Sequence, residues 1–172
     1  MAKQKTFIAI KPGYAQKKNI VDYIEETLKN SGCKIIKKTT AHYTYEQAME
    51  HYNQIPERFQ IPAATYLSSA PVIGYILEDN RNDDSDLSFI DYVRSVQGNT
   101  RCTEGGTIRY VVVNDPRFSE EVADVRKNFM DKEKGIDEIT TNILHASDSP
   151  ANFLRETKIF DAAAMDNEPE NN

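Results

Sequence analysis

The residues whose side chains are best suited to catalysis lie close together near the end of the chain. His145 ends a short apolar run, and Ser147 follows it. Ser149 and Pro150 suit a helix N-cap and a first helical position, so the next helix carries Glu156. A neutral imidazole is a competent nucleophile, and a carboxylate or hydroxyl fixes its tautomer. The spacing indicates a histidine that accepts a phosphoryl group, with a satisfied core or strand-end histidine as the alternative.

Residues that suit phosphate binding are spread along the rest of the chain. Lys11 ends the first predicted strand, Arg94 lies on a predicted helix, Thr100 lies in a glycine-containing loop and Arg109 follows a glycine turn. Lysine meets phosphate as a point charge, and arginine binds it through two parallel hydrogen bonds. Taken singly, each residue also fits an exposed cation or an ordinary turn residue.

Two aromatic residues, Tyr52 and Phe59, flank a predicted loop and could stack on a nucleobase, although aromatic residues more often fill cores. The chain has no Walker A motif, no kinase glycine-rich loop and no dinucleotide fingerprint. A phosphotransferase of this sequence therefore belongs to another type.

Composition bounds the protein class. The chain has 172 residues, of which 39% are hydrophobic and 28% charged, and its net charge is -6. We expect a single domain over 1–160 and a flexible acidic tail over 161–172. A general nucleic-acid binder is more often basic, so no specific nucleic acid is expected.

Localisation and metal content are also predicted. The two cysteines, Cys33 and Cys102, have no metal-ligand spacing and form no disulfide framework, so no protein-bound metal is expected. The sequence has no signal peptide and no run of membrane-spanning length. We expect a cytoplasmic protein.

The elements that must position these residues mix strands and helices irregularly, which favours an α+β sandwich of one sheet with packed helices. Asn19 is the expected cap of one helix, and Thr44 and Gln47 have capping-box spacing. A loop with Pro56 and Pro62 precedes a helical turn ending at Ser69. The predicted strands are 6–11, 33–43, 71–77, 108–113 and 142–145, and the predicted helices are 19–31, 45–53, 87–98, 119–134 and 149–158.

From Thr6 to about Glu156 the chain resembles the nucleoside diphosphate kinases. The stretch 142–149, Asn-Ile-Leu-His-Ala-Ser-Asp-Ser, is the most specific match. The other matches keep their order along the chain, and this joint order makes coincidence improbable. They are Ile-Ala-Ile-Lys-Pro at 8–12, His51-Tyr52, Pro71-Val72, Arg94 with Thr100, and Gly106-Thr-Ile-Arg109.

The resemblance implies a ferredoxin-like α/β sandwich with an antiparallel four-stranded sheet covered by helices, plus a helical insertion near 114–141. It implies transfer of the γ-phosphate of a nucleoside triphosphate to a nucleoside diphosphate by a ping-pong mechanism, with broad nucleobase tolerance. It further implies Mg²⁺ bound through the nucleotide phosphates, and a dimer-based homo-oligomer, either a hexamer or a tetramer.

The resemblance also assigns roles by position. His145 would be the nucleophile, with Glu156 and Ser147 orienting it. Phe59 would stack on the base. The residues implied to hold phosphates and ribose are Lys11, Tyr52, Arg94, Thr100, Arg109 and Asn142.

This sequence departs from the family pattern around the expected site. The usual Lys-Pro-Asp-Gly is Lys11-Pro12-Gly13-Tyr14, Tyr110 stands where Gly-Asp is usual, and the connection from Arg109 to Asn142 is much longer. A weakly active or inactive nucleotide-binding regulatory relative that acts through protein partners is therefore the alternative. Phosphorylation of protein histidines is a third possibility that the sequence does not separate from the first.

Overall fold

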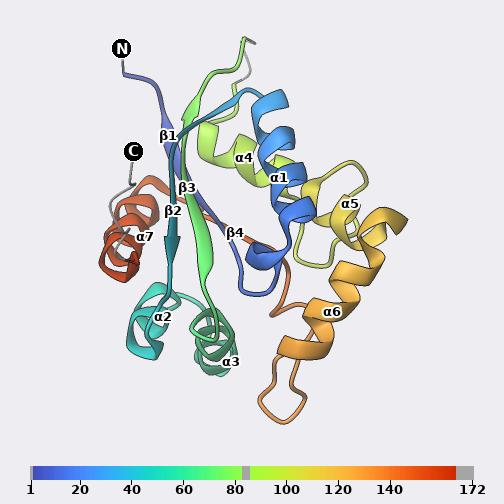
Figure 1. The fold of residues 1–172 in the computed structure, drawn as a ribbon. Helices are drawn as coiled ribbons and strands as arrows, with labels where there is room; N and C mark the ends of the chain where they lie inside the picture. Colours follow the sequence, from blue (N-terminus) through green and yellow to red (C-terminus); the bar gives the residue numbers. More distant parts are fainter. Residues whose placement is uncertain (1, 83–85, 166–172) are drawn as a thin grey trace, which may run out of the picture.

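The computed structural model describes residues 2–82 and 86–165, and it shows one sheet with helices against both faces (Figure 1). Among these residues, no helix combines the length and apolar character needed to cross a membrane. In chain order the elements are β1 (Lys5–Ile10), η1 (Tyr14–Gln16), α1 (Lys18–Asn30), β2 (Cys33–Ala41), α2 (Tyr45–His51), α3 (Glu57–Leu67), β3 (Val72–Asp79), α4 (Phe89–Gln97), α5 (Ile108–Asn114), η2 (Pro116–Phe118), α6 (Ser119–Phe129), β4 (Leu144–Ala146) and α7 (Pro150–Ala163).

The sheet has four strands in the order β2-β3-β1-β4. Every neighbouring pair is antiparallel, and β1 is central because Ile8 lies opposite both Tyr75 of β3 and Ala146 of β4. This arrangement confirms the predicted ferredoxin-like sandwich with an antiparallel four-stranded sheet. It also places β4, which carries His145, beside the strand that ends next to Lys11.

Both faces of the sheet are buried, which explains the nearly continuous apolar sequence of β1. Ile8 and Ile10 pack with residues of α1, α4, α5 and α6 in one cluster. Phe7 and Ala9 pack on the opposite face with residues of α2, α3 and α7. Successive strand residues point to opposite faces, so a strand covered on both sides cannot alternate apolar and polar residues.

Local capping explains where several helices begin. Thr44 and Gln47 form the predicted capping box of α2. The Ser149 side chain accepts a hydrogen bond from the backbone N–H of Asn152, with Pro150 at the first position of α7, as predicted. The predicted cap at Asn19 was wrong, because α1 begins at Lys18 and Asn19 lies inside it.

The stretch 108–113, predicted as a strand, is the helix α5. The Thr107 side chain accepts a hydrogen bond from the backbone N–H of Tyr110 and so caps the helix. Ile108 and Val112 are four residues apart and both fully buried, so one helical face enters the core. Tertiary burial and the cap outweigh the strand propensity of this β-branched sequence.

The helix that ends near Ser69 is longer than predicted. Helix α3 begins directly after Pro56 and includes Pro62, which was predicted to lie in a loop. Phe59 therefore lies in the first turn of α3, directly after the loop that follows α2.

The insertion is partly helical, as predicted, but its helix is shorter. Helix α6 ends at Phe129 rather than near 134, and a tight turn follows in which Asp131 and Ile136 pair. Val122 and Val125 are buried in the main core cluster, so the insertion is built into the domain.

The C-terminal elements shift slightly from their predicted bounds. Strand β4 runs Leu144–Ala146 rather than 142–145, and α7 continues to Ala163, so its last turn includes residues assigned to the tail. The remainder of the predicted tail, 166–172, lies outside the described residues, as do residues 83–85.

Candidate functional site

A pocket of about 730 Å³ opens where β1 and β4 end, and α3, α4, the loop before α5 and the end of the insertion enclose it. The structure brings most of the predicted site residues to this pocket. Those that line it are Lys11, Tyr52, Phe59, Arg94, Thr100, Arg109, Asn142 and His145. The two others, Ser147 and Glu156, are buried and lie behind His145.

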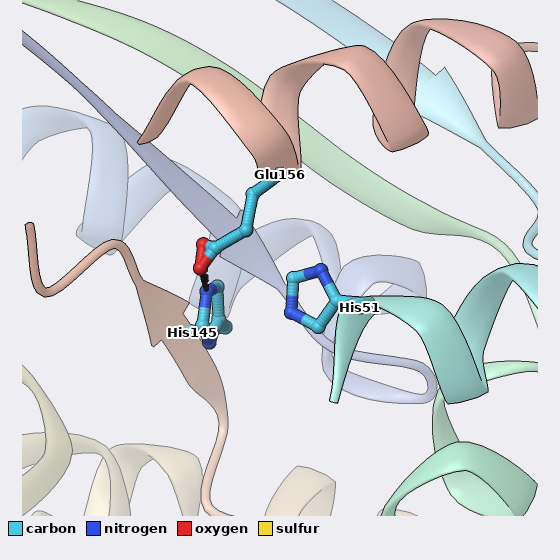
Figure 2. Close-up of side chains that lie close together, drawn as sticks. All are labelled: His51, His145 and Glu156. Atoms are coloured by element: carbon cyan, nitrogen blue, oxygen red, sulfur yellow. Dashed lines mark hydrogen bonds and ion pairs between the residues drawn. The ribbon is translucent and has the colours of Figure 1, made fainter. Parts of the chain in front are cut away.

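His145 is held by β4 on one side and by α7 on the other. It lies opposite Ala9 in the sheet, and its side chain is 20% exposed. Its Nε2 lies 2.7 Å from Oε1 and 2.9 Å from Oε2 of Glu156 (Figure 2). Ser147 donates its hydroxyl to Glu156 Oε2 at 3.0 Å. The carboxylate is therefore fixed by the same short segment whose imidazole it contacts.

The hydrogen bond to Glu156 decides which ring nitrogen is available. An ionised carboxylate only accepts hydrogen bonds, so in the neutral ring Nε2 carries the hydrogen. The lone pair is then on Nδ1, and Figure 2 shows this nitrogen on the side of the ring away from Glu156. A nucleophile oriented in this way needs no further base.

Lys11 and Asn142 form a polar pair in the floor of the pocket. Lys11 Nζ donates to Asn142 Oδ1 at 2.7 Å and lies 3.5 Å from the carbonyl oxygen of Thr140. Burial, with a smaller contribution from the nearby Arg109 charge, lowers the pKa of Lys11 to about 7. A buried lysine with so few compensating partners is suited to an anionic ligand.

The Arg109 guanidinium donates three hydrogen bonds to backbone carbonyl oxygens. Its Nε donates to the carbonyl of Asn142 at 2.9 Å, its Nη1 to Gly98 at 2.9 Å and its Nη2 to Leu144 at 2.6 Å. Burial lowers its pKa to about 10. Because a guanidinium has five N–H groups, hydrogen atoms remain for a ligand, but the residue also ties the pocket walls together.

The backbone that Arg109 holds is strained. Ile143 has φ 79°, which is rare for a β-branched residue. The Leu144 N–H donates to the carbonyl of Asn142 at 2.9 Å. This hydrogen bond closes a three-residue γ-turn, and with a positive φ at its central residue it is the rarer, strained type. The N–H of Lys11 donates to the carbonyl of Ile143 at 2.8 Å. Such strain persists where the surroundings over-determine it, and it aims Asn142 into the pocket just before His145.

The mouth of the pocket combines exposed cations with exposed apolar groups. Arg94 and Thr100 are exposed on its α4 side. The Phe59 side chain is 50% exposed, and the Arg58 guanidinium lies 4.6 Å from its ring centre. This mixture suits a ligand with a charged end and a flat apolar end.

The end of the insertion supplies pocket residues that the sequence did not point out, namely Gly135, Asp137, Ile139 and Thr140. Ile139 is 46% exposed at the pocket. Nothing in the residue types of 135–140 separates them from an ordinary turn. Their position in space, not their chemistry, makes them part of the site.

His51 is a second residue whose position sequence analysis did not predict. Its ring centre lies 4.4 Å from that of His145 at an interplanar angle of 72°. It is 4% exposed, and burial, followed by the His145 charge, holds its pKa well below the usual value. Its neighbour Tyr52 packs edge-on against it at 4.7 Å. Only the motif His51-Tyr52 pointed here, and it carried no role for the histidine.

The chain is similar to known phosphotransferases along nearly its whole length. The sequence pattern of the nucleoside diphosphate kinase family matches residues 4–164. The nucleoside diphosphate kinase of Methanothermobacter thermautotrophicus is 29% identical over 160 residues, which are 91% of this chain and 86% of that protein. That of Ruegeria pomeroyi is 29% identical over 163 residues, or 93% of this chain and 94% of that one.

A solved structure extends this similarity to the fold. A crystal structure of the Aquifex aeolicus nucleoside diphosphate kinase superposes with a TM-score of 0.59 at 26% identity, and the match covers 92% of this chain and 94% of that one. Sequence and structure agree over the same span, and the family pattern includes both β1 and α7. The chain belongs to the nucleoside diphosphate kinase family.

Proposed function

We propose that this protein transfers the γ-phosphoryl group of a nucleoside triphosphate to a nucleoside diphosphate, in two steps, through phosphorylated His145. One observation carries the proposal: Glu156 and Ser147 hold the Nε2 side of His145 in a pocket that Lys11, Arg94 and Arg109 also line. Phosphoryl transfer depends mainly on positioning and on charge neutralisation, and both are supported by this arrangement.

In the first step, the Nδ1 lone pair of His145 attacks the γ-phosphorus, and the bond from that phosphorus to the bridging oxygen breaks. The nucleoside diphosphate leaves with the electron pair of this bond. The ring keeps its hydrogen on Nε2 and becomes positively charged, and the Glu156 carboxylate at 2.7 Å stabilises that charge. In the second step, a terminal phosphate oxygen of another diphosphate attacks this phosphorus, the P–Nδ1 bond breaks, and its electron pair returns the ring to its neutral form.

The cations of the pocket neutralise the phosphates. Lys11 provides a buried charge, Arg94 an exposed one, and Arg109 provides the N–H groups that its backbone contacts leave free. Thr100 donates its hydroxyl to a phosphate oxygen, and Asn142, Tyr52 and Lys11 hold the ribose and the inner phosphates. Phe59 and Ile139 offer apolar surface to the base, which supports broad base tolerance because such contacts do not recognise hydrogen-bonding edges.

Mg²⁺ fits this pocket as a companion of the nucleotide. The ion prefers oxygen ligands, and the described lining offers Asp137 and Asp148 as separate carboxylates rather than as a cage. The nucleotide phosphates would hold the ion, which, when bound, neutralises charge on the transferred group. A dimer-based homo-oligomer, hexameric or tetrameric, and a cytoplasmic location also belong to the proposal, and family membership supports both.

The test is intact-protein mass after incubation with ATP and Mg²⁺, followed by a chase with a second nucleoside diphosphate. We expect a gain of one phosphoryl group that disappears on chase. It should be absent in His145→Ala and present in His42→Ala, a control at an exposed histidine outside the pocket. Nucleotide binding without any mass gain would support the regulatory alternative instead.

A further inference from the structure

His51 is a buried side chain whose ring nitrogens find no hydrogen-bond partner among the described residues. Within the described part of the chain, neither Nδ1 nor Nε2 of His51 has a hydrogen-bond partner, although the residue is only 4% exposed. An unsatisfied buried polar group costs roughly 1 to 3 kcal/mol. The ring lies edge-on toward His145, and Figure 2 shows one ring edge of His51 facing the His145–Glu156 pair. A ring nitrogen in this state is available to coordinate a bound species.

The three side chains His51, His145 and Glu156 lie close enough for side-chain movement to bring their ligand atoms around one metal ion. One ligand atom from each of His51, His145 and Glu156 can be chosen so that all lie within 4.8 Å of one another. In a tetrahedral zinc site, ligand bonds of about 2.0 to 2.1 Å place the ligand atoms about 3.3 Å apart. The His145–Glu156 contact must therefore widen slightly, and the His51 ring must approach, both of which are side-chain rotations.

We propose that a zinc-class divalent ion binds to one ring nitrogen of His51, Nε2 of His145 and the carboxylate of Glu156. Two imidazoles and a carboxylate are a ligand set that zinc uses when one coordination position stays open. The pocket lining includes His145 but neither His51 nor Glu156, so the ion lies behind the imidazole, and a water molecule fills the open position. Mg²⁺ does not compete for this set because it prefers oxygen ligands in octahedral geometry.

Metal binding at Nε2 changes the chemistry of His145, a consequence that rests on the proposed function. The ion takes the Nε2 lone pair, and the hydrogen formerly on Nε2 moves through solvent to Nδ1. The Nδ1 lone pair becomes an N–H bond, and the ring gains no net proton. The atom that would attack phosphorus is then blocked. The site is thus an inhibitory one, because the metal requires the ring hydrogen on Nδ1 and phosphoryl transfer requires it on Nε2.

Binding is tested first, without nucleotide. Metal-free protein is titrated with Co²⁺, whose visible absorption reports tetrahedral coordination, and Zn²⁺ is then added to displace it. We expect one Co²⁺ per chain in the unaltered protein and in His42→Gln, which changes an exposed histidine. The spectrum should be lost in His51→Leu and in Glu156→Gln. A leucine at position 51 removes the ligand and leaves no unsatisfied nitrogen in the buried space.

The tautomer is tested in the unaltered protein by ¹⁵N-histidine NMR, which is simple because the chain has 3 histidines. Zn²⁺ should move the His145 hydrogen from Nε2 to Nδ1. Phosphotransfer with buffered Zn²⁺ is then compared with phosphotransfer without it, for each variant against its own metal-free rate. We expect a loss of about tenfold or more in the unaltered protein and in His42→Gln, and little loss in His51→Leu. Because Zn²⁺ also binds nucleotides equally in all reactions, the comparison between variants isolates the protein site.

Two results would overturn the metal site: no tetrahedral Co²⁺ spectrum, or a spectrum that survives in His51→Leu. Binding without a tautomer change or without inhibition would overturn the inhibitory role. If the zinc-free protein fails to transfer phosphate in the presence of Mg²⁺, the proposed function falls, and the Co²⁺ spectrum still decides the metal site independently.

Discussion

Arg109 is tied to the backbone of Leu144, the residue before His145: its Nη2 donates to the Leu144 carbonyl at 2.6 Å. Two further donors of the same guanidinium hold Asn142 and Gly98. A residue that the sequence marked only as a phosphate ligand therefore also fixes the strained turn on which the nucleophile depends. Its substitution should change stability as well as nucleotide binding.

We expect Arg109→Lys to lower the free energy of unfolding by about 2 to 4 kcal/mol, because one ammonium cannot replace a fork of donors and buried carbonyls lose their partners. Urea denaturation measures this change. Arg94→Lys is the matched control, since Arg94 is exposed at the same pocket. It should weaken nucleotide binding without lowering stability. Equal stability of the two variants would contradict the role in the turn.

Glu156 acts through His145, and its charge is expected to matter more than its hydrogen bond. Glu156→Gln keeps an acceptor for Nε2 but removes the charge that stabilises the phosphorylated ring, so protein phosphorylation should slow by about 100-fold. Ser147→Ala removes only the 3.0 Å contact to the carboxylate and should cost about 1 kcal/mol of stability and a smaller share of the rate. Single-turnover kinetics against pH distinguish the two. A Glu156→Gln variant with an unchanged rate and pH profile would exclude the electrostatic role.

The fold was predictable where local chemistry and burial agree. Strand β1 is apolar, and the Thr44–Gln47 box and the Ser149 cap are short-range patterns, so all were predicted. Residues 108–113 were not, because their β-branched composition favours a strand, whereas the Thr107 cap and the burial of one helical face decide the outcome. That burial depends on α6, which lies on an insertion whose packing no local pattern specifies.

The site was predictable only as far as residue type and order along the chain allow. Lys11, Arg109 and His145 were found because the resemblance keeps their order, and the pocket contains them all. The contact of His51 with His145, and the approach of Ile139 to the pocket, join segments that are far apart in sequence. Such contacts are fixed by the sheet order and the insertion, neither of which the spacing of single residues reveals.

Lys11 makes nucleotide binding depend on pH. Its pKa in the free protein is about 7, and bound phosphates favour the charged form and raise it. Between the two pKa values the complex holds one more proton than the free protein and the free nucleotide together, so affinity falls as pH rises, by up to about tenfold per unit. Measurements from about pH 7.5 avoid the second phosphate ionisation near 6.

Calorimetry with ADP in two buffers of different ionisation heat measures this proton uptake directly. Lys11→Met is the control, and its affinity should be weak and nearly independent of pH over the same range. In the unaltered protein without nucleotide, the pH dependence of stability has the opposite sign to that of nucleotide affinity: the free energy of unfolding rises with pH. The unfolded chain holds the proton up to about pH 10.5 and the folded one only to about pH 7, so this group favours folding more as pH rises between them. Proton release on ADP binding would contradict the assignment.

Gly13 and the insertion are coupled by close packing. Gly13 has φ +84°, and a Cβ there would lie 2.7 Å from both Phe129 Cε2 and Val125 Cγ1 of α6. The glycine that replaces the usual acidic residue in this turn is thus the residue that the insertion requires. Gly13→Ala should cost about 2 to 4 kcal/mol, of which about 1 to 2 comes from the backbone conformation and the rest from overlap.

Gly106→Ala separates these two contributions, because Gly106 has φ +83° but no atom of the described residues lies within 4 Å of its Cβ position. It should cost only the backbone part, about 1 to 2 kcal/mol. Adding Phe129→Ala to Gly13→Ala should recover part of the overlap cost, so the double-mutant cycle should show a favourable coupling of about 0.5 to 3 kcal/mol. Urea denaturation of the four proteins of the cycle measures it. Strict additivity would mean that α6 does not constrain the turn after Lys11, and that the insertion and the altered turn arose without physical linkage.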